Sequence, residues 1–319
     1  MDLFGFQPDP QRGPALDARM HAELASSLAH LADSLPGLGG HLRPIIARIN
    51  AGARLPPVGF GHYFQTAERA LAGDEAGAEQ SAQHLARVPD ATPGLSVLRW
   101  GGDSAADLVA TYCNRTPTAS DRMAETPEEL RADFAARLSA GLDLMAHVLP
   151  DLHAEITGIL RQVLLVRSAP GSGYRFDGGS HYQFWGLLLL NADRHRSPVE
   201  IVEVLAHEAG HSLLFGLTVD EPLVLNPDEE LFASPLRDDP RPMDGIYHAT
   251  FVSARMAWAM ERLATAPALD PAERATAAAA AARDRENFAK GHDVVARHGR
   301  LSDTGARIMA NARQWVAQG

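Results

Sequence analysis

The stretch "SPVEIVEVLAHEAGHSLLFG", residues 197–216, decides how the rest of the sequence is interpreted. Ser197, Pro198 and Glu200 are residue types that favour the N-cap, first and third positions of a helix. The residues that follow are mostly apolar, as in a buried helix. The stretch therefore predicts a helix from about residue 198 to residue 216, with the motif His-Glu-x-x-His inside it.

The helical repeat places the polar residues of this motif. His207 and His211 are four residues apart, so their imidazoles lie on one face, one turn above the other, and can bind a single metal ion. Glu208 is turned by about 100° from His207 and reaches the side where a metal-bound water or a substrate would lie. Glu203, one turn before His207, can orient the second nitrogen of that ring. The pattern predicts a metal site on this helix.

Two aliphatic segments before the motif predict strands. Gln162–Ser168 is short and partly β-branched, and Tyr182–Leu190 ends in a continuous apolar run. Both have the length of buried strands. Together with the helix around the motif, they predict a predominantly α-helical α+β fold with a small β-sheet next to the metal-binding helix.

Helical periodicity accounts for most of the remaining chain. Thr126, Pro127 and Glu129 are typical of a capped helix start. Residues 88–125 are rich in turn formers, and we assign no element to them. The further helices that we predict are 14–34, 41–50, 64–72, 75–87, 126–148, 150–161, 244–266, 271–297 and 302–317.

Chain length and composition suit one or two globular domains. The chain has 319 residues, of which 45% are hydrophobic, enough to bury a large core. We expect a helical N-terminal region over 1–125 and a metal-binding catalytic region over 126–319, or one continuous domain. Cys113 is the only cysteine. A disulfide within the chain and a cysteine-based metal site are therefore excluded, and a reducing compartment is the natural setting.

Charge and hydropathy argue against two classes of partner. The net charge of −11 disfavours nucleic acid, because phosphate binding needs a dense Lys/Arg surface. No apolar stretch is long enough for a transmembrane helix, and the first residues lack the basic and apolar regions of a secretory signal. We expect a cytoplasmic protein without a nucleic-acid or membrane partner. The oligomeric state stays open.

A third metal ligand distinguishes the enzyme classes that carry this motif. In metzincins, a glycine and a histidine follow the second motif histidine at fixed spacing. Those positions are Leu214 and Leu217 here, which excludes that class. In a zinc-dependent metallopeptidase of the thermolysin type, Glu208 would be the general base and a later glutamate the third ligand. Glu229 or Glu230 would have to fill that role, in a segment interrupted by proline.

His248 is the other candidate for the third ligand. It lies near the start of the helix predicted over 244–266, on an apolar face with Ile246, Phe251 and Val252. A histidine on such a face is often a hydrogen-bonded core residue. Position alone therefore leaves its role open.

A longer block around the motif resembles one bacterial family, the 2-oxoglutarate-dependent peptide β-hydroxylases of the His-Glu-x-x-His type, also described as peptide-modification proteins. The resemblance is sharp around the motif and diffuse elsewhere. It rests on the segments LAHEAGHSLLF (205–215), DEPLVLN (220–226) and SPLRDDPRPMDGIYHATF (234–251).

This resemblance implies a non-haem iron centre. His207, His211 and His248 would bind Fe(II) and leave open positions for 2-oxoglutarate and O2. Glu208 would be a catalytic residue beside the metal, as a further ligand or as a base. A three-histidine site would differ from the more usual set of two histidines and one carboxylate.

The resemblance also implies a cosubstrate site and a reaction. The distal carboxylate of 2-oxoglutarate needs a cation, and a guanidinium binds a carboxylate through two hydrogen bonds. Arg237 and Arg241, in a proline-rich loop, are the candidates. The expected reaction hydroxylates the β-carbon of a residue in a ribosomally made peptide, with or without a leader sequence, in natural-product biosynthesis.

Two other functions stay open on the residues alone. The first is the zinc-dependent metallopeptidase, with Zn(II) bound by the motif and Glu208 as general base. The second is a non-catalytic peptide-binding module with a structural metal, which requires a closed coordination shell.

Overall fold

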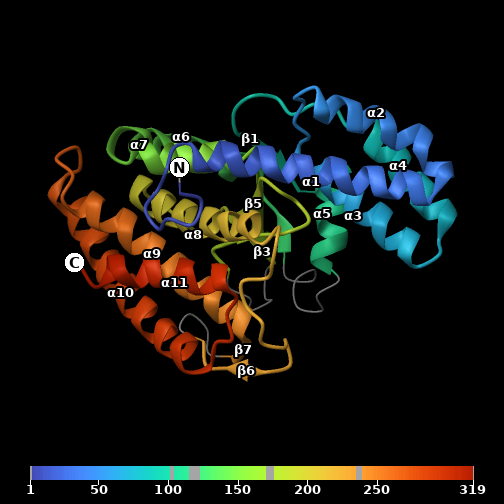
Figure 1. The fold of residues 1–319 in the computed structure, drawn as a ribbon. Helices are drawn as coiled ribbons and strands as arrows, with labels where there is room; N and C mark the ends of the chain where they lie inside the picture. The colour runs from blue at the N-terminus through green and yellow to red at the C-terminus, as the bar shows by residue number, and fades with distance from the viewer. Residues whose placement is uncertain (1, 101–103, 115–122, 170–175, 235–238, 319) are drawn as a thin grey trace. The chain divides into compact units, whose positions relative to one another are not determined.

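The architecture is taken from a computed structural model, which describes residues 2–100, 104–114, 123–169, 176–234 and 239–318 (Figure 1). Helices account for 64% of the structure, and the described strands form a five-stranded sheet and a two-stranded ribbon. The prediction of a predominantly α-helical α+β fold is confirmed. Across the described ranges, no helix combines the length and apolar composition that spanning a membrane requires.

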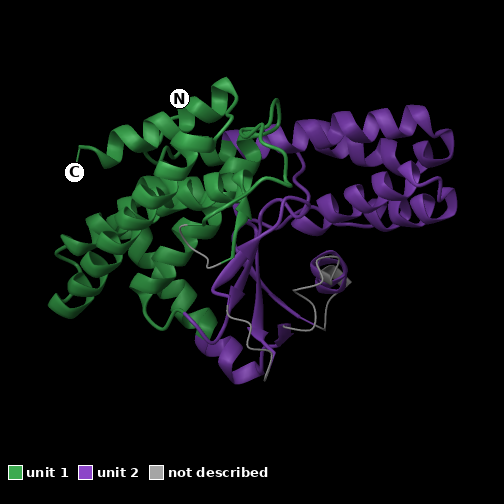
Figure 2. Cartoon of the chain, turned by 90° about the horizontal axis from the view of Figure 1, so that it is seen from below, with its two compact units in different colours: residues 1–14, 134–158, 195–319 green, residues 15–133, 159–194 purple. Residues whose placement is uncertain are grey.

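The chain forms two compact units that interleave along the sequence (Figure 2). Unit 1 contains Met1–Pro14, Phe134–Gly158 and His195–Gly319, and unit 2 contains Ala15–Asp133 and Ile159–Arg194. The boundary predicted after residue 125 lies close to the passage from unit 2 into unit 1. The chain then returns to unit 2, so the two units are not consecutive.

Unit 2 begins with a series of helices. Its helix α3 starts before the predicted residue 64, because Pro57 occupies the first turn and the glycines after it are helical. Gly61 is required for close packing, since a Cβ there would lie 2.4 Å from Cε1 of Phe184. The helical elements are α1 (Arg12–Ser34), whose first turn belongs to unit 1, η1 (Pro36–Leu38), α2 (Gly39–Asn50), α3 (Pro57–Leu71), α4 (Glu75–Ala86) and α5 (Ser104–Asn114).

The five-stranded sheet is built around β3 (Gln162–Ser168), which has the predicted bounds. Its strand order is β1-β3-β5-β4, and β2 pairs antiparallel with the end of β3. β1 and β5 are parallel to β3, and β4 is antiparallel to β5. The other strands are β1 (Ser96–Arg99), β2 (Met123–Glu125), β4 (Gly178–Ser180) and β5 (Leu187–Asn191).

The second predicted strand begins later than expected. Residues before Leu187 form turns, in which the backbone N–H of Phe184 donates to the carbonyl of His181. Gly186 has a φ of 85°, a conformation that favours glycine and ends the turn. Only the aliphatic part of the predicted segment is therefore a strand.

The core of unit 2 contains apolar side chains from the sheet and from α5. Leu164 and Leu189 pack with Val109 and Tyr112 of this helix. Cys113 lies in the same cluster, where burial raises the pKa of its thiol to about 11. The thiol is therefore protonated at neutral pH, as expected for a plain core cysteine.

Unit 1 is a helical assembly around α8 and α9. Both helices are buried along most of their length, which explains why α8 is apolar on nearly every side. Gly210 of α8 lets α9 approach, because a Cβ there would lie 3.0 Å from Cγ1 of Val252. The elements are α6 (Glu128–Val148), which belongs to unit 1 from Phe134 onward, α7 (Pro150–Ile159), whose last residue belongs to unit 2, α8 (Pro198–Leu217), β6 (Leu231–Phe232), β7 (Arg241–Pro242), α9 (Met243–Ala264), α10 (Pro271–His298) and α11 (Asp303–Val316).

The two predicted helix starts differ in detail. Ser197 caps α8 as predicted, since its hydroxyl accepts from the N–H of Glu200 at 3.2 Å. The Glu200 carboxylate accepts from the N–H of Arg196, one residue before the position a capping box requires. At α6 the predicted cap is not made: the hydroxyl of Thr126 is buried without a hydrogen bond to any described residue, and the helix begins at Glu128.

A buried ionic triad of Arg12, Glu155 and Arg255 joins the N-terminal segment to α7 and α9 in unit 1. Nε of Arg12 donates to Oε1 of Glu155 at 2.6 Å, and Arg255 donates to Oε2. The arginines also donate to backbone carbonyls, Arg12 to Gln7 at 2.5 Å and Arg255 to Phe6 at 2.8 Å. Each charge therefore has several partners.

Candidate metal centre

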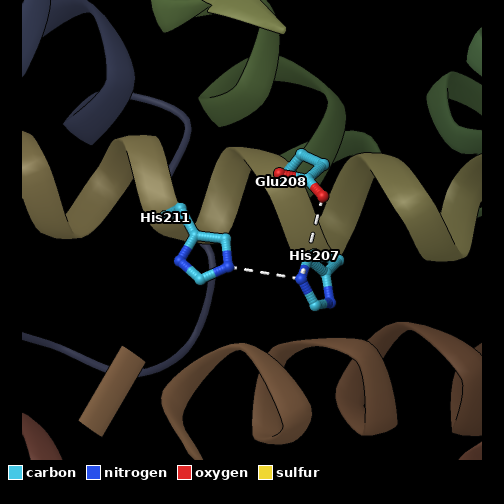
Figure 3. A group of neighbouring side chains, drawn as sticks. All are labelled: His207, Glu208 and His211. Carbon is cyan, nitrogen blue, oxygen red and sulfur yellow. Dashed lines mark hydrogen bonds and ion pairs between the residues drawn. The ribbon is translucent and has the colours of Figure 1, made fainter. Parts of the chain in front are cut away.

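Helix α8 brings the two motif histidines together as the helical spacing predicts. The Nε2 atoms of His207 and His211 lie 3.2 Å apart. Figure 3 shows both rings on the same side of the helix, with these nitrogens facing each other. The face they share is the one on which a metal ion was expected.

Glu208 completes the group. Its side chain is buried, and Oε1 lies 3.8 Å from Nε2 of His207. One ligand atom from each of His207, Glu208 and His211 lies within 4.8 Å of the others. Within the described ranges, no other set of three or more His, Cys, Asp or Glu residues meets this condition.

The donor set fits a divalent transition metal. Two nitrogens 3.2 Å apart, each at ~2.1 Å from a shared ion, subtend roughly 100° at that ion. This angle suits both tetrahedral and octahedral coordination. Two imidazoles and a carboxylate are ligands used by both Zn(II) and Fe(II).

His248 reaches the same place from α9. Its Nδ1 lies 3.0 Å from Nδ1 of His211, and the two rings are nearly parallel, 15° apart. Phe215 covers the ring at a centroid distance of 5.5 Å. Burial lowers the pKa of His248, while Asp244, 3.9 Å from Nε2, acts in the opposite direction. A neutral imidazole, which can ligate or accept a hydrogen bond, is thereby favoured.

The side from which His248 approaches bears on its role. His211 faces His207 with Nε2 and His248 with Nδ1. An ion held between the Nε2 atoms of His207 and His211 would leave Nδ1–H of His211 to donate to His248. In this conformation, His248 is placed as a hydrogen-bond partner of a ligand. To be the third ligand, His248 would have to rotate its ring toward the ion. This assignment stays a prediction.

The acidic residues that a thermolysin-like peptidase would use lie outside this group. Glu230 accepts from Asn226 at 3.0 Å and from Arg300 at 2.9 Å. The hydrogen bond from Asn226, followed by that from Arg300, lowers the pKa of Glu230. Glu229 is exposed. Neither belongs to the set of donors that could hold the metal.

Of the two predicted carboxylate-binding arginines, Arg237 lies outside the described residues. Arg241 forms part of β7, and a terminal nitrogen of its guanidinium lies 2.9 Å from Oδ2 of Asp239. Its Nε is buried and has no hydrogen-bond partner among the residues that the structure describes. Because this atom is buried, an anion could reach it only if the side chain moved.

One buried acidic residue near α8 was not predicted. Asp284 of α10 is 1% exposed. The buried residues of α10 include Ala277, Ala280, Ala281 and Phe288, and Asp284 continues their helical spacing. A carboxyl group on an apolar helix face was the available sequence signal.

Comparison with known proteins adds no identification: no model of a protein family matches the chain, and no curated protein matches it.

Proposed function

We propose that this protein is an Fe(II)- and 2-oxoglutarate-dependent oxygenase that hydroxylates the β-carbon of an amino-acid residue in a peptide. The observation that carries the proposal is the donor set of α8, two imidazoles and one carboxylate whose ligand atoms lie within 4.8 Å. Two histidines and one carboxylate with open positions are typical of non-haem Fe(II) oxygenases. The resemblance of the surrounding block to peptide β-hydroxylases points to the same chemistry.

Each residue of the centre has a role in this proposal. His207 and His211 hold the iron, which when bound supplies the site where 2-oxoglutarate and O2 react. His248 either provides the third ligand, as the resemblance implies, or fixes the ring of His211 from its Nδ1 side. In the second case Glu208 completes the usual set of two histidines and one carboxylate.

The centre is buried on one side and accessible on the other. Glu208 is 4% exposed, and Phe215 lies against His248. The side chain of His207 is 25% exposed and His211 is half-buried, so small molecules in solution can reach the two imidazoles. Arg241 would supply the cation for the distal carboxylate of 2-oxoglutarate, as the resemblance implies. A reducing compartment such as the cytoplasm suits a chain with a single cysteine.

A zinc-dependent metallopeptidase is the second candidate. The position of Glu208, 3.8 Å from Nε2 of His207, is compatible with a general base acting on metal-bound water. Among the described residues, neither candidate glutamate is placed as a third ligand, because Glu230 is held by Asn226 and Arg300 and Glu229 is exposed, and this argues against the peptidase. The oxygenase therefore accounts for more of the donor set.

One experiment separates the two. The purified protein is loaded with Fe(II) without oxygen, then given O2 and 2-oxoglutarate, and succinate is measured. We expect succinate from the wild type, even without a peptide, and none from His207→Ala or His211→Ala. His147→Ala is the matched control, because His147 is exposed at the end of α6. Arg241→Gln is expected to raise the KM for 2-oxoglutarate.

The peptidase hypothesis predicts different results. Absence of succinate, together with Zn(II)-dependent cleavage of labelled casein that Glu208→Gln abolishes, would establish the peptidase. A KM for 2-oxoglutarate that Arg241→Gln leaves unchanged would move the carboxylate site to another cation.

A further inference from the structure

Asp284 is a buried carboxyl group to which the packing of unit 1 offers no hydrogen bond. Neither of its oxygens accepts a hydrogen bond from any described residue, although the side chain is almost wholly buried. The group lies on the apolar face of α10, with Ala281 and Phe288 among its buried neighbours in sequence. A polar group in such a place costs free energy, so fold stability does not account for it.

Arg283 connects Asp284 to the metal-binding helix. Its Nε lies 3.7 Å from Oδ1 of Asp284, and a terminal nitrogen of the same guanidinium donates to Oε1 of Glu203 on α8. The guanidinium therefore lies between carboxyl groups from two helices. Burial, reinforced by Glu203 and opposed by Arg283, raises the pKa of Asp284 to about 8.

Glu203 lies one helical turn before His207. Residues four apart on a helix are neighbours on its surface. In Figure 3, His207 turns Nε2 toward His211 and Glu208, which leaves its other nitrogen for a second partner. A carboxylate beside the second nitrogen of a ligand histidine fixes its tautomer and its orientation. The spacing of Glu203 and His207 is the one that such a contact requires.

We propose that Asp284 is a positioning residue of the metal centre: acting through Arg283, it fixes the carboxylate of Glu203 beside Nδ1 of His207 and so sets the orientation of this ligand. The side chain of Arg283 is 55% exposed. Without the contact to Asp284, it is free to turn into solvent and to take Glu203 with it. This inference rests on the metal centre of the proposed function, but not on the reaction.

The affinity for Co(II) alone tests the inference, measured by calorimetry and by the visible spectrum of the bound ion. We expect Asp284→Leu to weaken Co(II) binding by about 10- to 100-fold, as for other residues that support a metal ligand, and to alter the spectrum. Its midpoint of unfolding should equal or exceed that of the wild type. Asp284→Asn should retain the affinity, because its amide oxygen can still face Arg283.

Two further variants make the test independent of folding. Arg283→Gln changes a half-exposed side chain and is expected to lose as much affinity as Asp284→Leu. Asp293→Asn is the matched control, since this exposed residue of α10 pairs with Arg297 and faces no metal ligand in the described structure. It should bind Co(II) as the wild type does.

The outcomes distinguish this inference from the proposed function. Wild-type affinity and spectrum in Asp284→Leu or Arg283→Gln would overturn the positioning role. So would a loss of affinity in Asp284→Asn equal to that in Asp284→Leu. A wild type that binds no Co(II) would overturn the metal centre and this inference together. Co(II) binding that depends on Asp284, in a protein that forms no succinate, would overturn the reaction alone.

Discussion

Unit 1 contains two polar clusters that differ in how their members are paired. In the ionic triad of Arg12, Glu155 and Arg255, donors meet acceptors of opposite charge or backbone carbonyls. In the imidazole cluster of His207, His211 and His248, nitrogens face nitrogens at 3.2 Å and 3.0 Å. Each charge of the triad meets a partner of opposite charge, whereas each short contact of the imidazole cluster joins two ring nitrogens, which either share a proton or face a common cation. We therefore expect the triad to be structural and treat the imidazole cluster as the candidate binding site.

Removing the shared carboxylate of the triad is expected to have the largest effect. Glu155→Gln would leave two buried arginines without a counter-charge, and breaking a buried ion pair in this way costs about 3–5 kcal/mol. The free energy of unfolding in denaturant measures the change. Glu286→Gln is the control, because this exposed residue pairs with Lys290 on the surface of α10 and should leave the free energy of unfolding close to that of the wild type. A loss below 1 kcal/mol in Glu155→Gln would contradict a structural role.

Metal is expected to stabilise the imidazole cluster and to leave the triad unchanged. A ligand present at 100 times its Kd adds about 2.7 kcal/mol to the free energy of unfolding. Anaerobic unfolding with and without Fe(II) should show a gain of this order in the wild type and none in His211→Ala. Glu155→Gln should gain as much as the wild type. The same change in the free energy of unfolding on adding Fe(II) to all three proteins would remove the distinction between the clusters.

Asp284 provides a pH-dependent test of an unsatisfied buried group. Its pKa is about 8 in the folded chain against an ordinary value of 3.8, so the folded state holds a proton that the unfolded state releases. The contribution of Asp284 to the free energy of unfolding therefore falls as pH rises from about 4 to about 8, and then levels off. Asp284→Asn removes the penalty and should gain about 2 kcal/mol over the wild type at pH 9.

Unfolding in denaturant at pH 5 and pH 9 measures the effect of Asp284→Asn. Glu203 and Arg283 are the charged groups that act on this carboxyl group, and the variant leaves both in place. Asp293→Asn should show the pH dependence of the wild type. Parallel curves for Asp284→Asn and the wild type would mean that Asp284 is ionised throughout this range.

The smallest effect concerns the cap of the metal-binding helix. Ser197→Ala removes the hydrogen bond to the N–H of Glu200 and should cost about 1 kcal/mol. The affinity for Co(II) should not change, because the cap lies more than two turns before His207. A loss of affinity as large as that of a ligand variant would show that the start of α8 orients the centre.

The sequence predicted best those helix and strand bounds that depend on neighbouring residues alone. The cap at Ser197 and the apolar run after it predicted α8 nearly to the residue. The strand expected from Tyr182 begins at Leu187 instead, because Gly186 adopts a positive φ that no apolar pattern reveals. The predicted cap at Thr126 is not made, since its hydroxyl is buried without a partner among the described residues. Composition indicated a helix there but not the conformation of its first turn.

The candidate site was predictable only in part, for the same reason. His207, Glu208 and His211 follow from spacing on one helix. His248 comes from a different helix, and only the resemblance pointed to it. The contact with His211 depends on how α9 packs against α8, which a single sequence does not specify. The link from Asp284 to Glu203 likewise joins residues far apart in the chain.

The interleaving of the units also constrains the order of folding during synthesis. Residues 15–133 and 159–194 leave the ribosome early and contain all the strands of the five-stranded sheet. The first residues belong to unit 1, where Arg12 shares its carboxylate with Arg255 of α9. Arg12 can pair with Glu155 once residues 134–158 have been translated, but the junction is complete only when Arg255 of α9 follows. A nascent chain released before α9 is made lacks the second arginine of this junction.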